Sequence, residues 1–168
     1  MKFKLSFLML ISFSLFSNIN AQNENCNCCT PEYDQFDFWL GSWMVFDTLG
    51  NAVGSNYIEK VEGNCALQEH WHSSGSTGTS LNFFDKKDGK WHQTWIDSKG
   101  ITLYLSGIKV GESMVLRSDL ITGRNGDFYH RITWTPQGED VVQRWEIVDV
   151  NNKPMRVLFE GIYKRDTE

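Results

Sequence analysis

The sequence predicts an all-β fold, a closed up-and-down antiparallel barrel of about ten strands. Turn signals recur at short, even intervals along the chain, and the segments between them are rich in β-branched and aromatic residues. Helical periodicity is nearly absent. The motif Gly41-Ser42-Trp43 opens the run, and in a barrel the glycine lets the chain bend while the tryptophan plugs one end. Closing the sheet would remove both exposed edges, and a two-sheet sandwich is the alternative architecture.

Residues 1–21 predict a signal peptide. Lys2 and Lys4 precede an apolar run from Leu5 to Phe16, and Ile19-Asn20-Ala21 fits a small-residue cleavage site. The apolar run is too short to span a bilayer core of roughly 30 Å. We therefore expect export to the periplasm or the extracellular space after cleavage near Ala21, without stable membrane insertion.

The rest of the chain divides into a Cys-containing lead-in, residues 22–35, and a single barrel domain, residues 36–165, which is long enough for a core. The formal net charge of the whole chain is −5, and loss of Lys2 and Lys4 makes the balance more negative. An acidic protein disfavours nucleic acids and anionic membrane surfaces as partners. Small-molecule or oligosaccharide ligands remain the expected partners.

The four cysteines predict disulfides, because an exported chain with an even number of cysteines usually pairs them. Cys26, Cys28, Cys29 and Cys65 allow three connectivities. A bond between the adjacent Cys28 and Cys29 would be strained, so we expect one cysteine of the lead-in to reach Cys65 and pin the lead-in to the barrel. The alternative is a thiolate site for a soft metal in the Cys-x-Cys-Cys cluster.

Nine turn signals separate ten strand candidates, each bounded by residues such as Gly, Asn, Asp and Pro. Tight turns at even spacing favour antiparallel neighbours that follow one another along the chain. The expected strands are 39–47, 53–62, 65–73, 78–85, 90–97, 101–108, 112–118, 127–135, 140–149 and 154–163.

Alternation along four of these segments indicates which side chains point inward, although a shift of one residue would reverse each assignment. In the segment 65–73, the face with Leu67, Glu69 and Trp71 is more apolar than the face with Gln68, His70 and His72, so we place it inside. The other shared faces are Trp91, Gln93, Trp95 and Asp97; Val141, Gln143, Trp145 and Ile147; and Phe128, His130, Ile132 and Trp134, which oppose Tyr129, Arg131 and Thr133.

These inward faces combine indole rings with hydrogen-bonding side chains. Buried polar groups cost about 1–3 kcal/mol each when they are left unpaired, so a purely structural barrel would favour an aliphatic interior. Polar groups between aromatic rings suit a hydroxylated ligand. The alternative is that the polar groups satisfy one another or bind water, and that the tryptophans form only a core. The expected substrate-binding residues are Trp71, Gln93, Trp95, Asp97, Gln143, Trp145 and Tyr163.

The histidines could form a metal site, because His70 and His72 share one face of a strand at a usable ligand spacing. His92 and His130 could supply further ligands. Alternation turns His70 and His72 outward, which favours surface histidines instead. We therefore expect no metal and no other cofactor.

Catalysis without a metal needs an acid, a base and a group that stabilises developing charge. Glu69, His130 and Arg131 are the expected catalytic residues, with Tyr163 as a further candidate. Arg131 could hold a carboxylate in a bidentate fork while Glu69 or His130 moves protons. These parts would suit elimination next to the carboxylate of a uronic acid. The alternative for Arg131 is a surface residue paired with Glu146.

Several motifs resemble a widespread family of small exported bacterial proteins of unknown function. They are Phe36-Asp37-Phe38-Trp39-Leu40-Gly41-Ser42-Trp43, Gly63-Asn64-Cys65-Ala66-Leu67-Gln68-Glu69-His70-Trp71, Trp91-His92-Gln93-Thr94-Trp95-Ile96-Asp97, Arg131-Ile132-Thr133-Trp134-Thr135-Pro136 and Gln143-Arg144-Trp145-Glu146. The resemblance covers nearly the whole chain after the signal peptide. It implies a calycin-like barrel, similar to lipocalins and nitrobindins, and it supports Glu69, Gln93, Asp97, Arg131 and Gln143 as site residues. A heme-ligand pattern like that of the nitrobindins is absent from the sequence.

Two functions follow as expectations. The first is an enzyme that acts on a carbohydrate, most concretely a lyase or dehydratase that eliminates water or a glycoside from a uronate-containing oligosaccharide. The alternative is a carrier without chemistry, which holds a small apolar or amphipathic ligand in the barrel.

Overall fold

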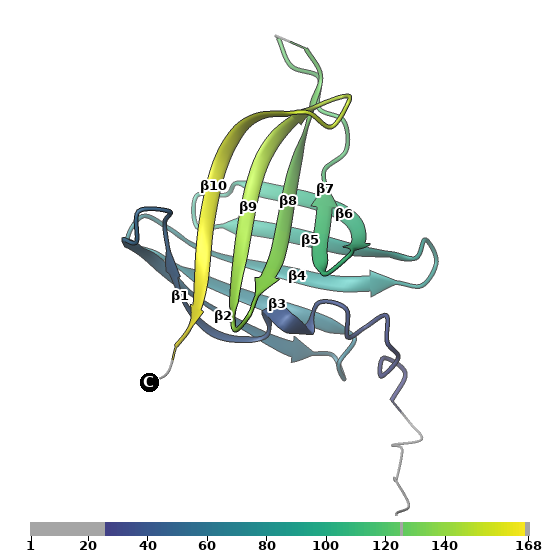
Figure 1. Cartoon of the computed structure of the whole chain (residues 1–168). Helices are drawn as coiled ribbons and strands as arrows, with labels where there is room; N and C mark the ends of the chain where they lie inside the picture. Colours follow the sequence, from purple (N-terminus) through teal and green to yellow (C-terminus); the bar gives the residue numbers. More distant parts are fainter. Residues whose placement is uncertain (1–25, 125, 167–168) are drawn as a thin grey trace, which may run out of the picture.

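Ten antiparallel strands close into a barrel, which confirms the predicted fold class and rules out the sandwich (Figure 1). The computed structural model describes residues 26–124 and 126–166, so the predicted signal peptide lies outside the described part. The strands are β1 (Gly41–Phe46), β2 (Ala52–Val61), β3 (Ala66–His72), β4 (Thr77–Asp85), β5 (Lys90–Asp97), β6 (Thr102–Val110), β7 (Ser113–Arg117), β8 (Phe128–Gln137), β9 (Asp140–Asp149) and β10 (Pro154–Arg165).

The connectivity gives the barrel two different ends. Each strand pairs with the next one along the chain, and β1 pairs with β10 to close the sheet. Because consecutive strands run in opposite directions, the β1–β2, β3–β4, β5–β6, β7–β8 and β9–β10 connections share one end, which we call the open end. The remaining hairpins lie at the opposite end, which we call the closed end.

Aromatic side chains plug the closed end. A short 3-10 helix, η1 (Asp37–Trp39), precedes β1, and the rings of Phe36 and Trp39 stack 5.0 Å apart, fully buried. The Trp43 indole donates a hydrogen bond of 2.8 Å to the Trp39 carbonyl oxygen. Gly41 has a φ of +113°, a conformation that glycine adopts without strain, and this residue turns the chain from the helix into β1. The opening motif therefore forms the plug that its sequence predicted.

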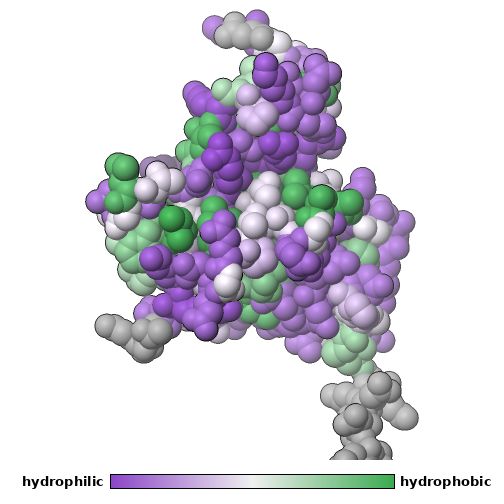
Figure 2. Space-filling view, viewed as in Figure 1, coloured by the Kyte–Doolittle hydropathy of each residue, from purple (hydrophilic) through white to green (hydrophobic). Residues whose placement is uncertain are grey.

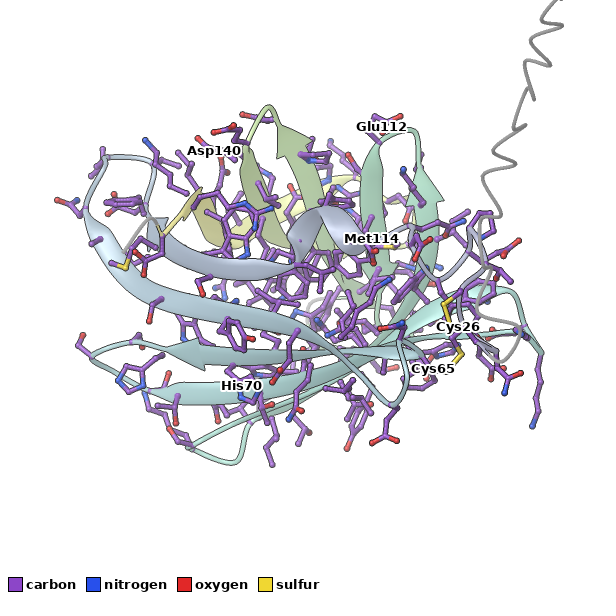
Figure 3. All side chains as sticks on the ribbon, turned by 90° about the horizontal axis from the view of Figure 1, so that it is seen from below. Cys26, Cys65, His70, Glu112, Met114 and Asp140 are labelled. Atoms are coloured by element: carbon purple, nitrogen blue, oxygen red, sulfur yellow. A yellow bond between two sulfur atoms is a disulfide. The ribbon has the colours of Figure 1, made fainter. Side chains whose placement is uncertain are left out.

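One disulfide fixes the lead-in to this end, and a second one closes a short loop within the lead-in (Figure 3). Cys28 bonds to Cys65, the residue before β3, and Cys26 bonds to Cys29. The predicted link from the lead-in to Cys65 is confirmed. Since all four described cysteines are oxidised, the alternative of a thiolate metal site is wrong.

The surface is mainly hydrophilic over the face seen in Figure 2, with small apolar groups scattered across it. One ion-pair network lies on the outer side of β8, β9 and β10, where Glu146 joins Arg131 and Arg144, and Arg144 continues to Glu160. In the described part of the chain, no helix is both long and apolar enough to cross a membrane.

Candidate functional site

A pocket of about 320 Å³ opens inside the barrel toward the open end. Ser76 of the β3–β4 hairpin and Ile101 of the β5–β6 hairpin lie at its mouth, and Glu69 of β3 lies deeper among buried residues. The lining is Glu69, Trp71, Ser76, Trp95, Asp97, Ile101, Leu103, Ile132, Gln143, Trp145, Leu158, Phe159 and Tyr163. It has the size and the mixed character of a small-ligand site.

The deep part of the pocket is a carboxyl group held by neutral donors. Glu69 is 4% exposed. One carboxyl oxygen accepts a hydrogen bond of 2.8 Å from the Asn56 amide, and the other accepts one of 2.6 Å from the Ser80 hydroxyl. Two neighbouring strands therefore fix the orientation of this side chain, because register pairs Glu69 with Ile58 of β2 and with Ser80 of β4.

A chain of hydrogen bonds continues from Ser80 into the barrel wall. The Gln93 amide donates to Asn82 at 2.8 Å, and the Asn82 amide donates to Ser80 at 2.8 Å. Each donor in this chain points toward Glu69, so the aligned dipoles favour an acceptor there. Gln93, a predicted substrate-binding residue, thus belongs to the support beneath the pocket and does not line it.

Burial dominates the electrostatics of this carboxyl group. Desolvation raises the pKa of Glu69 to about 7, although the hydrogen bonds from Ser80 and Asn56 act in the opposite direction. Near neutral pH the group therefore exists in both protonation states. A general base or acid in an active site needs a pKa in this range.

Tyr163 and Gln143 complete the polar end of the pocket. The Tyr163 hydroxyl donates a short hydrogen bond to the Gln143 side-chain oxygen. Burial raises the pKa of Tyr163 well above its ordinary value, and the nearby Glu69 charge adds to the effect, so the phenol stays protonated. The side-chain oxygen of buried Asn56, next to Glu69, has no hydrogen-bond partner. Asn56 is not in the pocket lining, so it belongs to the buried polar support around Glu69.

Aromatic rings form the walls. Trp71 meets Phe159 edge-on, with ring centroids 6.2 Å apart. Glycines make room for the two indoles from β3 and β5. A methyl group at Gly54 would lie 2.7 Å from the Trp71 ring, and one at Gly78 would overlap the Trp95 ring. The absence of side chains at these two positions therefore leaves room for the Trp71 and Trp95 rings, which line the pocket.

His130 contacts Trp145, which lines the pocket. The Trp145 indole donates a hydrogen bond of 3.0 Å to Nδ1 of His130, which must therefore be unprotonated. Burial lowers the pKa of His130, which also favours the neutral ring. His130 is not in the lining and its acceptor nitrogen is occupied, so the structure does not bring this predicted catalytic residue into the pocket.

Arg131 lies outside the barrel, contrary to its predicted role in holding a substrate carboxylate. Its guanidinium donates a hydrogen bond of 2.7 Å to Glu146 and a second one to the Asn152 carbonyl oxygen. It borders a groove on the outer surface of β6–β8 instead of the pocket. The alternation that turned His130 inward necessarily turned its neighbour outward, so the two cannot act on one ligand inside the barrel. The alternative pairing with Glu146 is confirmed.

The histidines do not gather into a metal site. His70 points away from the barrel interior (Figure 3) and lies 3.5 Å from Glu59, whereas His92 lies 3.0 Å from Asp88. Among the described residues, the one group of three potential metal ligands is Asp85, Asp88 and His92, on the exposed β4–β5 hairpin at the closed end. Exposed acidic groups of this kind are common without a metal.

The pocket brings together most of the predicted site residues, namely Glu69, Trp71, Trp95, Asp97, Gln143, Trp145 and Tyr163. Sequence reasoning missed the two glycines and the polar support from Asn56, Ser80 and Asn82. Alternation in β2 and β4 would have found that support, because Asn56 and Ile58 share a face, as do Ser80 and Asn82. Sequence reasoning also missed Leu158 and Phe159 of β10. These adjacent residues both reach the pocket because a bulge shifts the register between Val157 and Phe159.

The arrangement can bind an amphipathic molecule, with a polar end near Glu69 and an apolar body between the rings, and it can transfer a proton at Glu69. No protein-family model and no curated protein matches this chain, so the resemblance drawn from its motifs stays a prediction.

Proposed function

We propose that this protein is a binding protein that carries a small amphipathic molecule in the barrel pocket. The observation that carries the proposal is the division of the pocket into a polar deep end and apolar walls. Glu69, Gln143 and Tyr163 supply the polar end, while Leu103 and Phe159 belong to the apolar walls. The two disulfides support the predicted export, because such bonds persist in oxidising compartments.

Native mass spectrometry of freshly purified protein tests this proposal. We expect a retained small molecule, and we expect Leu158→Trp to abolish its retention because the indole would fill the pocket. Val157→Trp is the matched control, since Val157 is the preceding residue of β10, is 41% exposed and does not line the pocket. A bare mass, together with no binding of added amphipathic probes, would overturn the proposal.

The second candidate is the predicted carbohydrate lyase or dehydratase. The pKa of about 7 at Glu69 favours it, because this carboxyl group could accept a proton inside a pocket lined by aromatic rings. The position of Arg131 weakens it, since a uronate carboxylate in the pocket would meet no arginine and would lie near two acidic side chains, Glu69 and Asp97.

Incubation with a panel of uronate oligosaccharides tests the enzyme directly, because elimination creates a C=C bond that absorbs ultraviolet light. Activity that disappears in Glu69→Gln and survives in Arg131→Ala would support a lyase built around Glu69. If none of the oligosaccharides gives new absorbance, the lyase hypothesis is contradicted and the binding function remains.

A further inference from the structure

The charged side chains of the pocket lining are all acidic. Two acidic side chains, Glu69 in the deep part and Asp97 of β5 near the mouth, belong to the lining. Among the described residues that form the lining there is no lysine, arginine or histidine. Cations of the barrel lie elsewhere, for example Arg131 on its outer surface.

Glu69 is buried without a positive partner. Both of its oxygens accept hydrogen bonds from neutral groups, Asn56 and Ser80, and no cationic side chain contributes to the shift in its pKa. An ionised carboxylate in an apolar surrounding is costly unless an opposite charge accompanies it. The protein supplies aligned donors but no counter-ion, so a ligand that brings a positive charge would gain the full pairing.

The walls suit a cation as well. Trp71, Trp95, Trp145, Phe159 and Tyr163 all belong to the lining, and the faces of aromatic rings attract positive charge, most strongly in tryptophan. A neutral hydroxylated ligand would use the same rings, but it would leave the charge of Glu69 uncompensated.

We propose that the pocket selects small organic cations, namely amines whose ammonium group reaches Glu69 and whose apolar body lies between the aromatic rings. This inference rests on the proposed binding function and specifies the class of ligand. The ammonium donates charge-assisted hydrogen bonds to the Glu69 carboxylate, which belongs to the pocket lining. Asp97 at the mouth adds attraction for an approaching cation.

Three probes that share one phenyl ring and differ mainly in the charge of the end group test the proposal. They are 2-phenylethylamine, 2-phenylethanol and 3-phenylpropionate, and calorimetric titration at about pH 8 measures their affinities. At this pH most of Glu69 is ionised, because its pKa is about 7. We expect the amine to bind about tenfold or more tightly than the alcohol, and the carboxylate to bind most weakly.

Two variants test whether Glu69 causes the preference for the amine over the alcohol. Glu69→Gln should bring the ratio of amine to alcohol affinity close to one, since it removes the charge and nearly keeps the shape. Glu59→Gln is the matched control on β2, because Glu59 is exposed and contacts His70 on the outer side, and it should keep the ratio of the natural protein.

An alcohol that binds as tightly as the amine, or a preference that survives in Glu69→Gln, would overturn the inference while leaving the binding function in place. If none of the three probes binds but the purified protein retains a neutral or anionic molecule, the inference is also wrong and the carrier stands. If nothing is retained and nothing binds, the proposed function itself fails.

Discussion

Replacement of Glu69 by glutamine should change how the stability of the barrel depends on pH. Burial raises the pKa of this group from its usual 4.5 to about 7 in the folded protein. Between these two values the folded chain binds more protons than the unfolded chain, so stability falls as pH rises. Because one pKa unit corresponds to about 1.4 kcal/mol, the ionisation of Glu69 should cost about 3 kcal/mol of unfolding free energy between pH 4 and pH 8.

The assay is urea unfolding at constant ionic strength, followed by tryptophan fluorescence, at several pH values across this range. The quantity to compare is the unfolding free energy of the natural protein minus that of Glu69→Gln. We expect this difference to fall by about 3 kcal/mol from pH 4 to pH 8, since glutamine does not ionise. The other carboxylates cancel in this difference, and Glu59→Gln serves as the control for removing an exposed carboxylate.

A difference that stays constant with pH would refute the reasoning. It would mean that Glu69 has the same pKa in the folded and unfolded chains, and that its burial against neutral donors has no net electrostatic cost. A stability difference that grows in favour of the natural protein as pH rises would go further, because it would mean that the hydrogen bonds from Ser80 and Asn56, or a counter-ion, outweigh the desolvation of Glu69.

Three other substitutions give separate tests. Gly78→Ala should cost about 1–3 kcal/mol and weaken ligand binding, because the methyl group drives the Trp95 ring into the pocket, as calorimetry and thermal unfolding would show. Arg131→Ala should cost about 1–2 kcal/mol in urea unfolding by removing one partner of Glu146, yet leave ligand affinity unchanged. Loss of the Cys28–Cys65 bond, by serine at both positions, should cost about 4 kcal/mol in urea unfolding, since the bond closes a long loop.

Each has a matched comparison. Gly75→Ala should be nearly neutral, because open space surrounds Gly75, and an equal effect at both glycines would contradict the steric account. Loss of ligand affinity in Arg131→Ala would reinstate Arg131 in the site. Serine at Cys26 and Cys29 should cost only about 2 kcal/mol, since that loop is short, so equal losses from the two bonds would contradict the entropic argument.

Much of the fold was predictable because each strand is bounded by a turn with distinctive residues, and all ten expected segments overlap observed strands. The inward set on β3, including Glu69 and Trp71, followed from alternation alone. The position of Phe159 could not follow from it, because a bulge breaks the period of two in β10. Arg131 was predictable as an outward residue, but its chemistry suggested a role that its face of the strand excludes.

The contribution of the two glycines was harder to see. A glycine in a strand usually indicates a bulge or a close approach, and only the three-dimensional register shows that Gly78 lies beside Trp71 and Asp97 and accommodates the ring of Trp95. The one-directional hydrogen bonds that end on Glu69 likewise depend on which amides meet across β2, β3, β4 and β5.

The contrast between the two ends of the barrel has a consequence for how such a protein can diversify. The helix η1, the aromatic plug and the covalent link to Cys65 concentrate architectural constraints at one extremity. Hairpins at the other extremity, including those with Ser76 and Ile101, border the cavity without anchoring the lead-in. Surface loops tolerate replacement better than the elements they connect. Ligand specificity can thus change, in evolution or by engineering, through replacement of the hairpins at the open end. The disulfide-linked closed end would keep the barrel folded.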